Sequence, residues 1–120
     1  MTSYNPSNIF AKILSGDIPC TKVAESDHAL AFRDINPQAP SHILVIPKGA
    51  YVSMADFSAK ASDAEIGDFI RLIGQVAREE GLEGDGYRIL ANHGDNAHQE
   101  VPHFHIHICG GRALGPLLSG

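Results

Sequence analysis

Cysteine is scarce in this sequence, and no long apolar run is present. Cys20 and Cys109 are the two cysteines, and they form no C-x-x-C pair, so a disulfide framework or a thiolate zinc site has little to build on. No apolar stretch approaches the roughly 18 residues of a membrane-spanning helix. The first residues also lack the basic, apolar and small-residue regions of a secretory signal. The sequence therefore predicts a cytoplasmic protein with no membrane role.

Positive charge is sparse as well. Lys and Arg total 9 against 14 for Asp and Glu, which gives a net charge of -5 with neutral histidines. The basic residues form no run, and this argues against binding to a nucleic-acid backbone. A small anion is still a possible ligand, because backbone dipoles and imidazoles can hold one in an acidic protein. With 120 residues and no linker or repeat, we expect residues 1–120 to form one domain.

The first half of the chain predicts a short helix followed by strands. In "SNIFAKILSG" an amphipathic helix is expected to begin after Ser7 as N-cap and to stop at Gly16. The segments "KVAES" and "ALAFRD" are expected to form a hairpin. The aliphatic run 42–48, "HILVIPK", is typical of a strand buried on both faces, and we place it at the centre of its sheet.

The second half predicts one long helix and two further strands. A capping box of Ser62 and Glu65 opens the helix, apolar residues recur at helical spacing, and Gly81 ends it. "YRILAN" is expected to be a strand, and the polar loop "HGDNAHQE" follows it. The element order predicts an α+β fold with an antiparallel sheet, one long helix and one short helix.

Three histidines alternate in "VPHFHIHICGG", residues 101–111: His103, His105 and His107. Positions two apart share one face of a strand but scatter around a helix, so this segment is predicted to be a strand. Phe104, Ile106 and Ile108 would then face the core. The histidine face is predicted to stay free for chemistry.

Three interpretations fit this row. In a metal site, the outer two histidines would lie roughly 13 Å apart along a strand, whereas zinc needs each nitrogen at about 2.1 Å. Further ligands would have to come from His42, His93, His98 or Glu100. A purely structural row is costly, because each buried polar ring needs a partner. In nucleophilic catalysis on phosphorus, a neutral imidazole attacks while its neighbours hold phosphoryl oxygens.

The motif H-φ-H-φ-H-φ-φ, filled here by "HFHIHIC", resembles that of the histidine triad (HIT) superfamily of nucleotide hydrolases and transferases. The following "GGR" resembles the Hint branch, as do "NIFAKILSGDIP", "AFRDINPQAPSHILVIPK" and "ILANHGDNAHQEVPH". This resemblance implies a HIT-like fold, a homodimer and cleavage of purine nucleoside phosphoramidates to AMP and an amine. The tail "ALGPLLSG" resembles that of bacterial members.

Transferred to this chain, the family pattern implies a role for each histidine. His105 would attack the α-phosphorus and form a nucleotidyl-imidazole intermediate, which water then hydrolyses. His103 would form a hydrogen bond that fixes the ring of His105, and His107 would contact a phosphate oxygen. His42 matches a fourth family histidine near the site.

The same resemblance suggests the nucleotide contacts. Asp34 would bind the ribose hydroxyls, and Asn92 and Gln99 match positions around the phosphate, although both could be loop-capping amides. The walls of the purine pocket would be Phe10, Ile13, Ile18 and Ile35. The purine nucleotide is expected to be of the AMP or GMP type, with no cofactor and no metal; Asn8 and Ala11 stand where some relatives carry zinc-binding cysteines.

Two positions depart from the family pattern. Glu100 replaces a frequent Ser, whose hydroxyl is a candidate for assisting the leaving group, and His98 replaces a Gly. A carboxylate at the nucleotide site would repel a phosphate unless it is protonated or turned away. Dinucleoside polyphosphate hydrolysis and a non-catalytic nucleotide-binding or interaction module remain the alternative functions.

Overall fold

The computed structural model describes residues 3–117, so the last three residues of the predicted tail, 118–120, lie outside the described part. No helix within residues 3–117 has the length and apolar character needed to cross a membrane. The elements are α1 (Ile9–Ser15), β1 (Lys22–Glu25), β2 (Ala29–Arg33), β3 (Ser41–Pro47), α2 (Met54–Lys60), α3 (Asp63–Glu79), β4 (Tyr87–Leu90), the 3-10 turn η1 (Asp95–Ala97) and β5 (Ile106–Gly110).

Five strands form one antiparallel sheet in the order β1-β2-β3-β5-β4. The predicted hairpin is therefore confirmed as β1 and β2, and the predicted central strand is confirmed as β3. The pairing of β3 with β5 sets His42 opposite Cys109 and Leu44 opposite His107. This register brings His42 and His107, from strands far apart in the sequence, to neighbouring positions on one face of the sheet.

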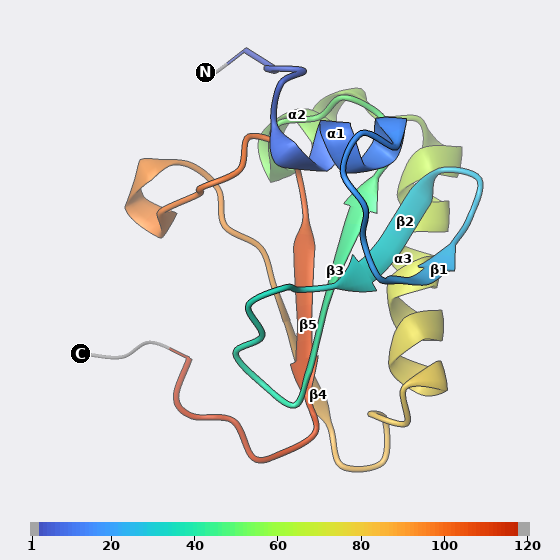
Figure 1. Ribbon diagram of the computed structural model, residues 1–120, viewed down its shortest axis with the longest axis vertical. Coiled ribbons are helices and arrows are strands. Elements are labelled where there is room, and N and C mark those ends of the chain that lie inside the picture. Colours follow the sequence, from blue (N-terminus) through green and yellow to red (C-terminus); the bar gives the residue numbers. More distant parts are fainter. Residues whose placement is uncertain (1–2, 118–120) are drawn as a thin grey trace.

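The two faces of the sheet carry different layers (Figure 1). On one face, Phe69 and Val76 of α3 pack with Ile43 and Val45 of β3. On the other face, Phe10 of α1 packs with alternate residues of the strands, including Leu30, Phe32, Leu44 and Ile46. Side chains alternate across a strand, so β3 is buried on both faces as predicted. Because α1 is short, it covers only part of its face.

Two predictions about the helices are corrected. The N-cap of α1 is Asn8 and not Ser7, since the Asn8 side chain accepts a hydrogen bond from the backbone N–H of Ala11. Helix α2 was not predicted: it is as short as α1, but no glycine marks its end, since its C-cap is Ala61. Its N-terminus is stabilised by Asp56, whose carboxylate accepts the backbone N–H groups of Val52 and Ser53.

The histidine segment also differs from its prediction. Strand β5 begins only at Ile106, so His103 and His105 precede it. Phe104, Ile106 and Ile108 do enter the core beneath α3. The expectation of a free histidine face is wrong for His103, which is fully buried (0% exposed).

Candidate active site

A pocket of about 660 Å³ lies on the α1 side of the sheet, between α1, the end of β2, the loop after β4 and the histidines. Ten of the twelve predicted site residues line it: Phe10, Ile13, Ile18, Asp34, Ile35, His42, Asn92, Glu100, His105 and His107. His103 and Gln99 do not. Side chains two positions apart on a strand lie on the same face of the sheet. Asp34 is two residues after Phe32 of β2, and His42 is two residues before Leu44 of β3. Because Phe32 and Leu44 face α1, Asp34 and His42 lie on that face too.

His105 is held with one ring nitrogen toward the protein. Its Nδ1 lies 2.7 Å from the main-chain oxygen of His103. A carbonyl only accepts, so Nδ1 carries the proton and donates. Burial lowers the pKa of His105 below its usual 6.5, and the ring is therefore neutral at pH 7. Its Nε2 consequently keeps a lone pair, and the ring lines the pocket beside the edge of Phe10.

The protonation of His42 and His107 follows from one backbone group. The backbone N–H of Gln38 donates to Nδ1 of His42 over 3.0 Å, so the His42 proton is on Nε2. That Nε2–H donates to Nδ1 of His107, 2.9 Å away. Burial, followed by the nearby His105 and His42, lowers the pKa of His107 to about 4. His107 is therefore neutral at pH 7 and has its proton on Nε2, ready to be donated to a ligand.

His103 forms the hydrogen bond predicted for it, but through its backbone and not its ring. The ring is hydrogen-bonded elsewhere: Nε2 donates to the main-chain oxygen of Pro47 (2.8 Å), and Nδ1 accepts from the hydroxyl of Tyr4 (2.7 Å). Only its backbone carbonyl orients His105. The ring contacts have a physical basis, because a fully buried imidazole needs a partner for each nitrogen, and Tyr4 and Pro47 supply these two. No sequence pattern pointed to Tyr4.

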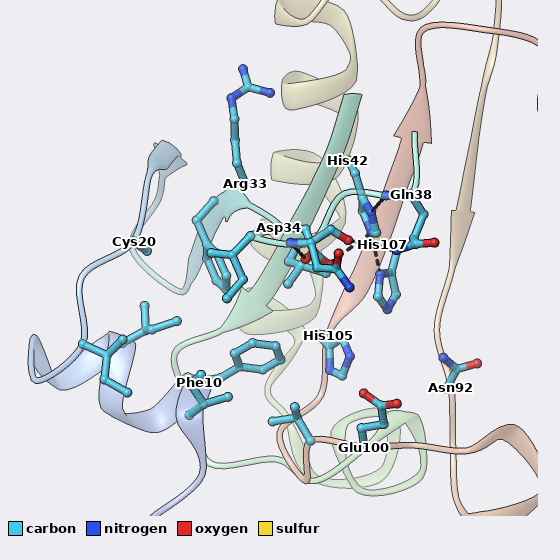
Figure 2. A pocket seen from close by; sticks show the side chains of 18 of the residues that line it. Phe10, Cys20, Arg33, Asp34, Gln38, His42, Asn92, Glu100, His105 and His107 are labelled. Atoms are coloured by element: carbon cyan, nitrogen blue, oxygen red, sulfur yellow. Dashed lines mark hydrogen bonds and ion pairs between the residues drawn. The ribbon is translucent and has the colours of Figure 1, made fainter. Parts of the chain in front are cut away.

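The apolar end of the pocket lies against α1 (Figure 2). Phe10 is buried there, whereas Ile35, which also lines the pocket, is 92% exposed. Asp34 lies between this end and the histidines. One of its oxygens accepts from the backbone N–H of Asn36 (2.8 Å), and the other lies 3.4 Å from Nε2 of His42. Each carboxylate oxygen can accept a further hydrogen bond, such as one from a hydroxyl.

The polar end is formed by the loop between β4 and β5. Asn92, His98 and Glu100 line the pocket there. His98 adopts a left-handed conformation (φ 55°), which is uncommon for a residue with a side chain. Gln99 faces away: its amide N–H groups donate to the carbonyls of Val52 and Val101, and its oxygen accepts from Gly94 N–H. The structure thus supports the loop-capping interpretation of Gln99.

One group of potential metal ligands occurs within residues 3–117: Asp34, His42 and His107, with ligand atoms within 4.8 Å of one another. His93, which sequence reasoning considered, is instead bonded to Ser53. The ligand atom of His42 would be Nε2, yet this atom carries the proton that the Gln38 N–H directs there. Metal binding would place that proton on Nδ1, against the Gln38 N–H, so the hydrogen bonds favour the metal-free arrangement.

Comparison with known proteins agrees with this geometry. Residues 15–114 match the HIT domain family. A HIT-like protein of Azospirillum brasilense is 62% identical over 117 residues, 98% of this chain and 96% of that protein. The purine nucleoside phosphoramidase of Escherichia coli K12 is 44% identical over 111 residues, 92% of each chain. A solved histidine triad protein from Clostridium difficile matches with a TM-score of 0.83 at 40% identity, covering 97% of this chain and 100% of that one. The predicted family and its α+β fold are confirmed, and this chain belongs to the HIT domain family.

Proposed function

We propose that this protein hydrolyses purine nucleoside 5'-phosphoramidates through a covalent intermediate on His105. The observation that carries the proposal is that two neighbouring imidazoles, His105 and His107, present a nucleophilic nitrogen and a hydrogen-bond donor to the same pocket. His105 offers a lone pair on Nε2, while His107 offers an N–H on Nε2. The ring centres are 5.1 Å apart. One phosphate group can therefore meet a nucleophile and a hydrogen-bond donor together.

The reaction would run in two displacements. Nε2 of His105 forms a bond to phosphorus as the P–N bond breaks, and the bonding pair leaves with the amine, which takes a proton from solvent. In the second step, water forms a bond to phosphorus and loses a proton to solvent. The P–Nε2 bond breaks, and its electron pair returns to Nε2. The products are a nucleoside monophosphate, an amine and the original imidazole. His107 would stabilise the phosphoryl oxygen in both steps, and no metal or cofactor is needed for either.

The rest of the pocket suits a nucleoside. A purine can pack against Phe10, Ile13, Ile18 and Ile35, while the Asp34 carboxylate accepts from ribose hydroxyls. The phosphoramidase of Escherichia coli, 44% identical, supports the same substrate class. The AMP or GMP type is therefore the proposed nucleotide.

The charges of the pocket favour phosphoramidates over dinucleoside polyphosphates. Asp34 and Glu100 are the anionic side chains that line it. The one Lys or Arg that lines it, within residues 3–117, is Arg33, whose guanidinium donates to Glu80 over 2.8 Å. A chain of several phosphates would bring more negative charge to a pocket with no cation free to balance it. A phosphoramidate with one phosphate avoids this cost.

The test is hydrolysis of adenosine 5'-phosphoramidate, with a chelator present, by the wild type, by His105→Asn and by His28→Asn. His28 lies outside the pocket and serves as the matched control. Turnover by the wild type and by His28→Asn, with none by His105→Asn although it still binds AMP, is the expected result. Turnover that survives His105→Asn would refute the mechanism. AMP binding without wild-type turnover would favour a binding module, and turnover confined to diadenosine polyphosphates would favour the polyphosphate hydrolase.

We propose further that the chain is a single domain that pairs with a second copy through β4. This strand ends the sheet, so one of its edges is unpaired within the described chain. Tyr87 and Ile89, two apart on β4, are 38% and 49% exposed. An open edge with exposed apolar residues is suited to pairing with an identical strand. Sedimentation should give a dimer for the wild type and a monomer for Ile89→Lys; a monomeric wild type would exclude the dimer.

A further inference from the structure

Glu100 lies at the end of the pocket that a bound nucleoside would leave open. In Figure 2 its carboxylate points toward His105, on the side where Asn92 lies, whereas Phe10 lies on the other side of His105. If the nucleoside fills the apolar end, the group released from phosphorus has to occupy the polar end. Glu100 is thus placed to meet the leaving group.

The charge of Glu100 is not balanced by its surroundings. Its carboxylate forms no ion pair with any side chain of residues 3–117, and the residue is exposed. Arg33, the Lys or Arg of the pocket, is paired with Glu80. Of the neighbouring imidazoles, His105 and His107 are kept neutral by burial, which lowers the pKa of both. Asp34 adds a second negative charge across the pocket, and His98 is the remaining ionisable group at the polar end.

We propose that Glu100 makes this site selective for phosphoramidates whose leaving amine carries a second, positively charged group. The inference rests on the proposed phosphoramidase function and specifies its substrate class. A distal ammonium on the amine would form an ion pair with the Glu100 carboxylate, and a distal carboxylate would be repelled by it. A neutral chain would have no electrostatic interaction with Glu100. Because Glu100 is exposed to solvent, each effect is modest: an exposed ion pair contributes at most about 1 kcal/mol, or about fivefold.

Three substrates whose amines each have four carbons isolate this effect. Adenosine 5'-phosphoramidates of putrescine, butylamine and γ-aminobutyrate carry a distal ammonium, methyl group and carboxylate. Values of kcat/KM are measured at low salt and at about pH 8, where histidine side chains are generally neutral. The enzymes are the wild type, Glu100→Gln and Asp95→Asn. Asp95 belongs to the same loop but does not line the pocket, so its variant loses the same charge without changing the site.

The wild type is expected to prefer the putrescine conjugate over the butylamine conjugate, and the butylamine over the γ-aminobutyrate conjugate, by about fivefold at each step. Glu100→Gln should bring the three values within about twofold, and Asp95→Asn should keep the wild-type order. Added salt should narrow the wild-type differences, since it screens exposed charges. Equal wild-type values, or an order that persists in Glu100→Gln, would overturn the proposal.

Failure of the proposed function would look different. If the wild type does not hydrolyse even the butylamine conjugate, the phosphoramidase function is wrong. The dissociation constants of the same three conjugates, measured by calorimetry, then test the charge preference alone. A preference that disappears in Glu100→Gln would support Glu100 as a selector of cationic ligands, and equal affinities would refute it.

Discussion

Nε2 of His42 donates its proton to Nδ1 of His107 across 2.9 Å. The proton is on that atom because the backbone N–H of Gln38 occupies the other nitrogen of His42. A main-chain group of the loop after β2 thus determines which nitrogen of His107 faces the pocket as a donor. The backbone thus sets the tautomers of His42 and His107 before any substrate binds. The hydrogen-bond donor then does not have to be reoriented during the reaction.

Replacing His107 by Ala should therefore reduce turnover more than binding. The variant loses the Nε2–H that would contact a phosphoryl oxygen in both displacements. Removal of one such donor costs about 10²-fold to 10³-fold in kcat. We expect kcat for adenosine 5'-phosphoramidate to fall by about 10²-fold, with a change of less than tenfold in the dissociation constant of AMP. Single-turnover kinetics and calorimetry check this, and an equal loss in both quantities would mean that His107 serves mainly to bind.

The fold and most of the pocket could be predicted from the sequence because local signals agreed with the tertiary structure. The capping box at Ser62 and the aliphatic run of β3 each predicted one element correctly, and the alternating histidines predicted β5 except for where it begins. The contacts of His103 could not be predicted, since they join residues far apart in the sequence: Tyr4, 99 positions away, and Pro47, 56 positions away. Nothing in the residues around His103 encodes which distant groups the core will place against its nitrogens.

The activity should persist to a lower pH than an ordinary histidine would allow. Burial lowers the pKa of His105 below 6.5, despite the opposing effect of its hydrogen bond to His103 and of Asp34 and Glu100. The nucleophile must be neutral, so the acid limb of the kcat/KM profile should have its midpoint below pH 6.5. A profile of kcat/KM against pH measures this directly, and a midpoint above 6.5 would contradict it.

The free energy of unfolding should also depend on pH in this range. It has to be measured as a control for the kcat/KM profile, because unfolding at low pH would also reduce activity. His107 has a pKa of about 4 when folded and an ordinary value near 6.5 when unfolded. Between these values the unfolded chain binds the proton and the folded chain does not, so the free energy of unfolding should decrease as the pH falls from 6.5 to 4. Urea titrations across this range should show the decrease, and His107→Asn should make it smaller; part of it should remain, because burial also lowers the pKa values of His103 and His105. A stability that rises on acidification would show that the folded site takes up protons.

Tyr4→Phe should destabilise the protein although it removes only one hydroxyl. Nδ1 of the fully buried His103 would lose its donor, and an unsatisfied buried polar atom costs about 1–3 kcal/mol. The His103 carbonyl that orients His105 should then be held less firmly, so kcat should also fall. Tyr51→Phe is the matched control, because it also removes one hydroxyl, but one that donates to the partly exposed carboxylate of Glu65, where water can replace it. If both variants unfold at the same urea concentration as the wild type, the hydroxyl of Tyr4 has no role in holding His103.

Asn92 and Gln99, two amides of one loop, should separate binding from stability. Gln99 makes three hydrogen bonds to the backbone, and Gln99→Leu leaves these groups without a protein partner, so the free energy of unfolding should fall by about 1–3 kcal/mol. Asn92 lines the pocket and forms no side-chain hydrogen bond within residues 3–117. Asn92→Ala should therefore lower kcat/KM with little change in stability. Urea unfolding and steady-state kinetics of both variants test these expectations. If Gln99→Leu is as stable as the wild type but binds phosphate more weakly, Gln99 contacts the phosphate and does not cap the loop.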